Sequence, residues 1–127
     1  MIKTFEDLEV YQLSIDITKI IYNLVNRLPI KERFIISDQM MRASTSIGAN
    51  IAEGFGRNST KEFLKFLYNA RGSLLELRHF TNLCKELNYV KENDLSNIKA
   101  KSDTLGIKIN NLINTLKKRS TNHFQSQ

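Results

Sequence analysis

Three long basic side chains follow one another at seven-residue steps in the middle of the chain: Arg71, Arg78 and Lys85. On a helix this spacing places them along one edge, where they could follow the phosphates of a nucleic acid. The same row is also what an ordinary amphipathic helix carries beside its apolar face, with the charged heads in water. A second basic cluster near the C-terminus gives further candidates for phosphate contacts: Lys117, Lys118 and Arg119.

Residues that could support catalysis are few. The two histidines, His79 and His123, have no Cys or acidic cluster at metal-ligand spacing. Cys84, the single cysteine, lies on the apolar face of a helical pattern. Burial there would raise the pKa of its thiol, so Cys84 is expected to be a poor nucleophile. Gly54 and Gly56 lack the further glycine and the Gly-Lys-Ser/Thr of a phosphate loop. The sequence therefore predicts no enzyme, no metal, no cofactor and no small-molecule substrate.

Composition and charge point to an ordinary globular protein with a basic second half. The chain has 127 residues, of which 41% are hydrophobic and 25% charged, and this suits one domain. Residues 1–56 carry six basic and seven acidic side chains, a charge of −1, and residues 57–127 carry thirteen and six, a charge of +7. This asymmetry favours a polyanionic partner such as RNA, although a basic surface that only keeps the protein soluble fits as well.

No segment of the chain reads as a membrane or export signal. No apolar run approaches the roughly 20 residues of a membrane span, and the N-terminal residues lack the apolar stretch of a signal peptide. We therefore expect a cytoplasmic protein with no membrane partner.

Apolar residues at spacings of three and four predict four helices. Their approximate ranges are 7–28, 31–55, 60–87 and 92–118. Four amphipathic helices joined by short links predict an all-α protein, an antiparallel up-down-up-down four-helix bundle over residues 1–119. The polar residues 120–127 are expected to form a flexible tail. In the apolar stripe of the fourth helix, Ser102 is the single polar member.

Local signals mark where these helices begin and end. Pro29 is expected to end the first helix. Gly54 and Gly56 are expected to end the second, since glycine supplies a left-handed closing residue. Ser59, with Glu62 three residues later, has the spacing of a capping box and is expected to open the third helix.

The core stripe predicted for the first helix is Val10, Leu13, Ile17, Ile20 and Leu24. A second apolar stripe lies roughly opposite: Tyr11, Ile15, Tyr22 and Val25. A helix that packs on one side needs one apolar stripe, so two stripes indicate that both sides are covered. We therefore regard these four residues as candidates for a contact between subunits. The other interpretation is a monomer with exposed tyrosines and an exposed isoleucine, which is not unusual.

The core stripe predicted for the second helix is Ile36, Met40, Ala43, Ile47 and Ile51. A polar ridge lies beside this stripe, and a strip of small residues that includes Gly48 indicates a closely approaching neighbour. A ridge in this place is either a solvated face or a hydrogen-bonded network. The residues of this polar ridge are Gln39, Arg42, Ser46, Asn50 and Glu53.

These residues lie within motifs that resemble a known family, the 23S rRNA intervening-sequence proteins. The resemblance spans about residues 4–116, nearly the whole chain. The motifs that carry it most clearly are Asn50-Ile51-Ala52-Glu53-Gly54-x-Gly56-Arg57 and Gly72-Ser73-Leu74-x-Glu76-Leu77.

The resemblance implies a function that the residue pattern alone does not. Members of this family are small bacterial proteins, some encoded within 23S rRNA genes, that form homopentameric rings of four-helix bundles and have no enzymatic activity. A more distant relative, the accessory protein of diversity-generating retroelements, is a basic pentamer that binds a reverse transcriptase and nucleic acid. We therefore expect a homo-oligomeric binding protein that contacts RNA, or a reverse-transcriptase-like protein associated with nucleic acid, through its basic surface. The alternative is a structural oligomerisation module that binds a protein partner without nucleic acid.

Overall fold

The computed structural model describes the backbone of residues 1–126 and the side chains of residues 1–120. Two short 3-10 helices, Phe5–Asp7 and Ile30–Glu32, accompany the four α-helices, and the described residues contain no strand. The predicted all-α class with four helices is confirmed. The α-helices are α1 (Glu9–Val25), α2 (Ile36–Phe55), α3 (Thr60–Glu86) and α4 (Glu92–Ser126).

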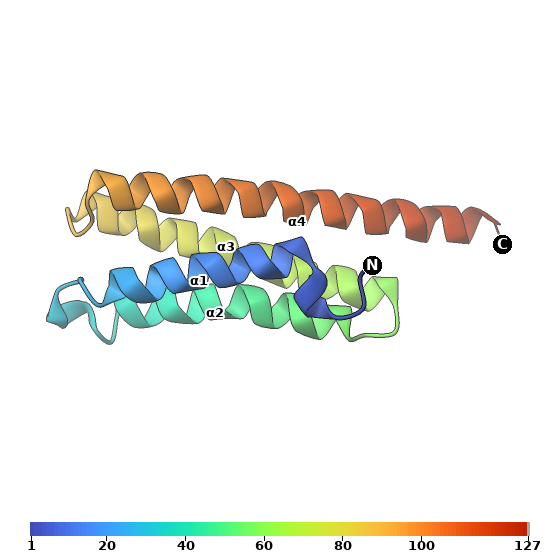
Figure 1. Ribbon diagram of the computed structural model, residues 1–127, viewed down its shortest axis with the longest axis horizontal. Coiled ribbons are helices and arrows are strands. Elements are labelled where there is room, and N and C mark those ends of the chain that lie inside the picture. The colour runs from blue at the N-terminus through green and yellow to red at the C-terminus, as the bar shows by residue number, and fades with distance from the viewer. Residues whose placement is uncertain (127) are drawn as a thin grey trace.

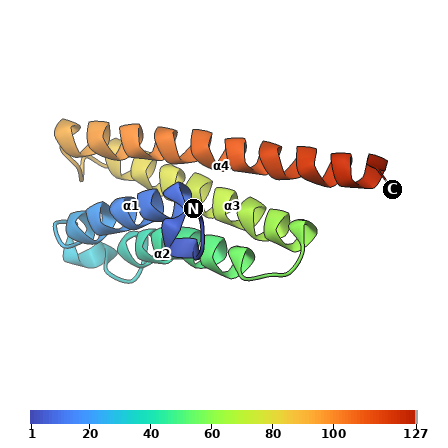
Figure 2. The same ribbon diagram turned by 45° about the vertical axis from the view of Figure 1, so that its right-hand side comes forward.

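The four helices lie side by side around one core (Figure 1). Each helix packs on its neighbours in the sequence, and α1 and α4 also contact each other. Two ion pairs join α1 to α4: Arg27, just after α1, meets Asp94 at 2.8 Å, and Glu9 at the start of α1 meets Lys108 at 3.3 Å. Figures 1 and 2 both show that the C-terminal part of α4 extends beyond the other three helices.

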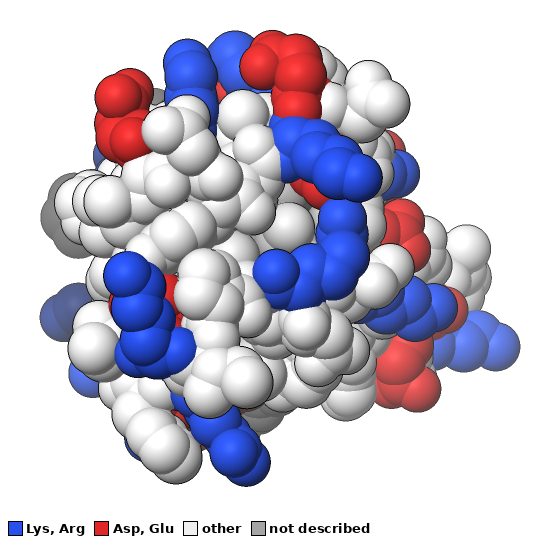
Figure 3. All heavy atoms as spheres, turned by 90° about the vertical axis from the view of Figure 1, so that its left-hand side faces the viewer, with Lys and Arg blue, Asp and Glu red and all other residues white. Residues whose placement is uncertain are grey.

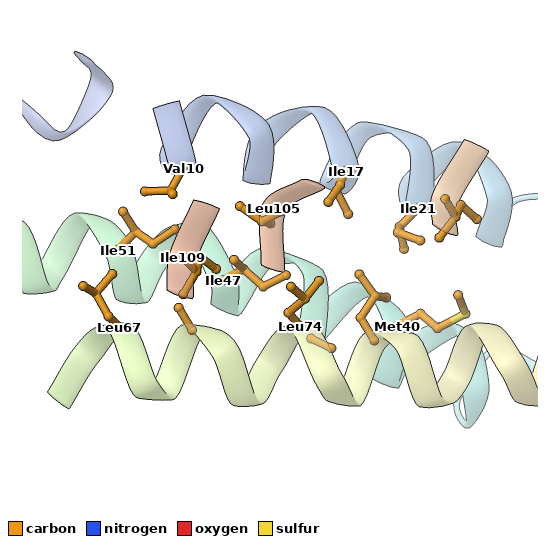
Figure 4. Packing of buried hydrophobic residues seen from close by; sticks show 14 of the residues in the cluster. Val10, Ile17, Ile21, Met40, Ile47, Ile51, Leu67, Leu74, Leu105 and Ile109 are labelled. Carbon is orange, nitrogen blue, oxygen red and sulfur yellow. The ribbon is translucent and has the colours of Figure 1, made fainter. Parts of the chain in front are cut away.

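The core consists of apolar side chains from all four helices (Figure 4). Removing a side chain such as Ile17 or Leu105 from water contributes about 1.5–3 kcal/mol, so this cluster is the main source of stability. In α1 the buried stripe includes Ser14 and Ile21, one position on from the half-buried Leu13 and Ile20 that the pattern favoured. The stripe predicted for the second helix is confirmed as buried, and its members are Ile36, Met40, Ala43, Ile47 and Ile51.

The link between α1 and α2 differs from the prediction. The second helix was expected from residue 31, but α2 begins at Ile36. Pro29 instead opens the 3-10 turn Ile30–Glu32, and Ile35 has a non-helical backbone with φ −120° and ψ −95°. Helical hydrogen bonding from α2 therefore cannot run back through this segment. The start of α3 is as expected, because the Oγ of Ser59 accepts a hydrogen bond from the Glu62 N–H at 3.1 Å.

The glycines at the end of α2 have another role than the predicted one. No described glycine has a positive φ, and Gly56, which follows α2, has φ −76° and ψ −7°. The expectation of a left-handed glycine was therefore wrong. Gly54 lies inside α2, where a Cβ would fall 2.6 Å from the Cβ of Phe66 on α3. The left-handed closing residue is Asn88, which follows α3 at φ 60°.

Helix α4 continues to Ser126, although its sequence pattern predicted an end near residue 118. No glycine or proline follows Gly106, so the chain carries no strong signal to end the helix earlier. The side chains after Ser120, and residue 127 altogether, lie outside the described residues. The flexible tail expected at 120–127, and the domain limit set by it, therefore stay predictions. Within the described part of the chain, no helix combines the length and apolar character needed to cross a membrane.

Candidate nucleic-acid interface

Two of the basic candidates meet on one aromatic ring. Tyr68 lies on α3, and the guanidinium carbon of Arg71 is 4.9 Å from the centre of its ring. The Nζ of Lys117, on α4, approaches the same ring to 5.6 Å. Arg71 also donates a hydrogen bond from Nη1 to the Oδ1 of Asn110 at 3.0 Å, which ties α3 to α4. The cations lie within the usual range of a cation–π interaction, so the ring holds two positive charges from separate helices.

Arg78 and Lys85 continue the row along α3. Arg78 pairs with Asp103 of α4 at 3.1 Å, and Lys99 meets the other oxygen of that carboxylate at 3.1 Å. Lys85 is exposed. From Arg71 to Lys85 the helix rises about 21 Å, a length along which one strand of nucleic acid carries roughly six phosphates. Asp103 neutralises part of the charge of this row, and the row's role in binding phosphates stays a prediction.

A cleft of about 330 Å³ lies between α3 and α4, beside the turn that joins them. Arg78 and Lys85 line it from α3, and Lys99 lines it from α4. Leu95 and Ile98 supply apolar surface. Figure 3 looks onto this end of the molecule, where Lys and Arg side chains are spread between wide areas that carry no charge.

The remaining two basic candidates lie further along α4. Lys118 and Arg119 are exposed and follow Leu116, the last buried side chain of the described residues. Lys117, the residue before them, lies over the Tyr68 ring. The six basic candidates thus fall into three places: the ring, the cleft and the exposed part of α4.

The middle of the polar ridge joins α2 to α3. The Nδ2 of Asn50 donates to the carbonyl oxygen of Ser46 at 2.8 Å and to its Oγ at 3.0 Å. Ser73, on α3, donates from its hydroxyl to the same Ser46 Oγ at 3.0 Å. All three residues are half-buried, so this part of the ridge is a hydrogen-bonded network between helices.

The flanks of the ridge face solvent. Gln39 is exposed, Arg42 pairs with Asp38 at 2.9 Å, and Glu53 pairs with Arg57 at 2.9 Å. Both pairs are exposed and join residues one helical turn apart, so each adds little to stability.

The second stripe of α1 divides into a covered and an uncovered part. Tyr11 is half-buried, with its ring at 75° to that of Phe5 and the centres 4.8 Å apart, and Val25 packs against the core. Ile15 and Tyr22 are exposed. They line a shallow, mostly apolar groove of about 360 Å³ between α1 and α2, together with Thr18, Lys19 and Thr45.

Some exposed apolar residues were missed in the sequence. Leu75 on α3 and Ile107 on α4 are 58% and 61% exposed. Each lies one turn from the two cross-links of this helix pair, Arg71–Asn110 and Arg78–Asp103. Phe34, in the link before α2, is 83% exposed. The sequence could have indicated that these residues are exposed, because they fall outside the three-four spacing of the core stripes.

The sequence predicted that Cys84 would be buried and a poor nucleophile, and its side chain is buried. Burial raises the pKa of the Cys84 thiol to about 11, and its Sγ lies 3.7 Å from the Sδ of Met40. Within residues 1–120, His, Cys, Asp and Glu side chains do not gather in the groups of three that could hold a metal ion.

Comparison with known proteins agrees with this fold. No curated protein matches the chain. A crystal structure of a protein of unknown function from the S23 ribosomal protein family, from Bacteroides thetaiotaomicron, is 27% identical in sequence. The similarity covers 82% of this chain and 97% of that one, with a TM-score of 0.76. The family model described as 23S rRNA-intervening sequence protein matches residues 6–111. The chain therefore belongs to the 23S rRNA-intervening sequence protein family.

Proposed function

We propose that this chain is a non-enzymatic, homo-oligomeric binding protein whose α3–α4 face contacts RNA. The observation that carries the proposal is the pair of cations, Arg71 and Lys117, on the ring of Tyr68. Proteins that bind single-stranded nucleic acid combine cations for the backbone with aromatic rings on which bases stack. The name of the family refers to 23S rRNA, which fits an RNA partner.

The salt dependence of RNA binding tests this proposal. Binding of a single-stranded RNA and of a structured RNA is measured by fluorescence anisotropy over a series of salt concentrations. Each phosphate contact contributes a slope of roughly 0.7–0.9 log units of affinity per log unit of salt. The double variant Arg71→Gln, Lys117→Gln should therefore bind more weakly, with a slope smaller by about 1.4–1.8.

A control with equal charge separates this contact from general attraction. Lys31→Gln with Lys108→Gln also removes two positive charges, but Lys31 lies in the α1–α2 link and Lys108 faces Glu9 of α1. The control should keep most of the affinity. Absence of RNA binding at low salt, or equal losses in the two double variants, would refute the proposed face.

We further propose that the subunit is an antiparallel up-down-up-down bundle that assembles into a homopentameric ring. Support for assembly comes from Ile15 and Tyr22, which line an apolar groove that the chain itself leaves open. A ring is closed by repeated contact between unlike faces, so this groove would receive another face of the next subunit.

Light scattering tests the assembly. The wild-type protein should have a mass about five times that of the 14.7 kDa chain, the multiple expected of a pentamer. Tyr22→Asp puts a charge into the groove and should lower the mass. Asn23→Asp adds the same charge on the next residue of α1, which does not line the groove, and should leave the mass unchanged. An unchanged mass in Tyr22→Asp would remove the groove from the interface.

A specific observation favours the alternative, a structural module that binds a protein partner without nucleic acid. Leu75 and Ile107 expose apolar surface on the face that carries the basic row, and exposed apolar surface is typical of protein contacts. Copurification of a stoichiometric protein partner that Leu75→Asp abolishes, together with no RNA binding, would support this alternative over the RNA proposal.

A further inference from the structure

The hydroxyl of Ser102 is the one buried side-chain polar atom without a hydrogen-bond partner in the described part of the chain. Ser102 is 1% exposed and belongs to the core stripe of α4. An unsatisfied buried hydroxyl carries an energetic cost that an alanine would avoid. Ser102 also lines the cleft between α3 and α4, so a molecule in the cleft could supply the missing partner.

The side chains around this hydroxyl are suited to an anion. Arg78 and Lys99 line the same cleft, and Asp103 holds each of them at 3.1 Å. A guanidinium has five N–H donors and an ammonium has three, so each cation can donate to Asp103 and still donate to a ligand. Asn82 adds an amide to the wall. This end of the cleft therefore offers two cations, a hydroxyl and an amide.

The other end of the cleft has different chemistry. Glu92, at the first turn of α4, is an acceptor, and Lys85 lies on the opposite helix. Between the two ends, Leu95 and Ile98 provide apolar surface. A matching ligand has an oxyanion at one end, an apolar body in the middle, and hydroxyl or amino donors at the other end. A volume of about 330 Å³ is at the small end of the range for small-molecule sites.

We propose that this cleft binds a nucleoside monophosphate group, with the phosphate at Ser102, Arg78 and Lys99 and the sugar or base toward Glu92. The group could be a free nucleotide or the phosphorylated end of an RNA. Because Arg78 and Lys85 also belong to the proposed RNA-binding face, the RNA-end form rests on the proposed function. The sequence did not predict this ligand, because the residues come from two helices that meet only in the fold.

Titrations followed by backbone amide NMR test the cleft directly. AMP should shift the amides of residues 78–85 and 92–102, and adenosine, which lacks the phosphate, should bind at least tenfold more weakly. Ser102→Ala and Lys99→Gln should each weaken AMP binding about tenfold, the effect of one lost hydrogen bond to a charged group. Lys108→Gln on the α1 side of α4 is the matched control and should bind AMP as the wild type does.

Ser102→Ala is suited to this test because it should fold: it removes an unpaired hydroxyl and fills nearly the same space. Absence of shifts in the cleft with AMP at millimolar concentration would overturn the proposal. So would equal binding of AMP and adenosine, or unchanged AMP affinity in both cleft variants.

A second arm separates the two sources of the phosphate. A short RNA is compared with and without a 5′-phosphate. If the site takes RNA ends, the 5′-phosphate should increase RNA affinity in the wild type and not in Ser102→Ala. If it takes free nucleotides, the wild type and Ser102→Ala should differ in affinity for AMP and should bind both RNAs equally. RNA binding that depends on Arg71 and Lys117 without any AMP binding would overturn this inference and leave the proposed function intact. AMP binding without RNA binding would refute the proposed function and leave this inference intact.

Discussion

Replacing Gly54 by alanine should destabilise the protein, although alanine is the better helix former. A Cβ at this position would lie 2.6 Å from the Cβ of Phe66 and 3.0 Å from the Cδ1 of Phe63. The Cβ of Phe66 is attached directly to the backbone, so no change of side-chain rotamer moves it away. Helices α2 and α3 would have to separate locally by most of an ångström to restore an ordinary contact.

Two opposing effects determine the size of the change. Alanine gains about 1 kcal/mol over glycine in a helix interior. Forcing an extra methyl group into a packed core typically costs about 1–3 kcal/mol, and more where the backbone must move. Because α2 and α3 form the most extensive helix contact of the bundle, we expect packing to dominate. The difference of these two effects spans about 0–2 kcal/mol. Because the backbone itself must move, the free energy of unfolding should fall by an amount near the upper end of this range, about 2 kcal/mol.

Urea unfolding followed by circular dichroism measures this difference, and Gly72→Ala is the matched control. Gly72 lies in the interior of α3, whereas Gly54 lies in the last turn of α2, and a Cβ on Gly72 would meet no atom within 4 Å. The control should therefore gain up to about 1 kcal/mol from helix propensity alone. If Gly54→Ala were as stable as Gly72→Ala, close approach to Phe66 could not be the reason for glycine at this position.

Three other predictions follow from local contacts. Cys84 should react with a thiol reagent at pH 8 only as fast as the protein opens, since burial raises its pKa to about 11; fast reaction in the folded state would contradict this burial. Arg27 donates hydrogen bonds to Asp94 and lowers the pKa of that carboxyl, so the pair should stabilise the protein above about pH 4 and lose its effect as the pH falls further. Asp94→Asn should accordingly differ from the wild type in urea unfolding at pH 7 and much less at pH 3, and an equal difference at both would refute the linkage. Ser59→Ala should cost about 1 kcal/mol through the lost cap on the Glu62 N–H, and an unchanged unfolding midpoint would show that the cap adds nothing.

The fold could be predicted because its main determinant is periodic in the sequence. Apolar residues at three-four spacing define four helices whatever their neighbours are, and the stripe from Ile36 to Ile51 is buried as expected. The structural reason for a glycine at position 54 could not be predicted in the same way, because Phe66 approaches Gly54 only after α3 has packed on α2. A glycine near a helix end favours a left-handed closing residue by statistics, and here a tertiary contact decides instead.

The candidate site was only partly predictable for the same reason. The row of Arg71, Arg78 and Lys85 is a property of one helix, so spacing alone reveals it. Lys117 joins it at Tyr68 from a different helix, and no local pattern connects them. The sequence gives no reason to single out Tyr68, because its role depends on cations contributed from two helices.

The three seams between successive helices differ in a way that bears on function. Close approach at glycine characterises two of them: a Cβ on Gly48 would lie 2.9 Å from the Ser14 Oγ between α2 and α1, and Gly54 has the contacts with α3 described above. The α3–α4 seam is cross-linked instead by long polar side chains, and a Cβ on Gly106 there would meet Leu74 at an ordinary 3.6 Å.

Polar cross-links between exposed side chains contribute less stability than a packed core, so the α3–α4 seam can exchange them for contacts with a ligand at little cost. The same seam contains the cleft, the unpaired hydroxyl of Ser102 and both cations at Tyr68. Among the described residues, Asp103 is the ion-pair partner that a phosphate would displace from Arg78 and Lys99. By contrast, a ligand between α2 and α3 would have to separate helices that already touch at Gly54. The packing of the bundle thus favours binding on the α3–α4 side, where the basic residues lie.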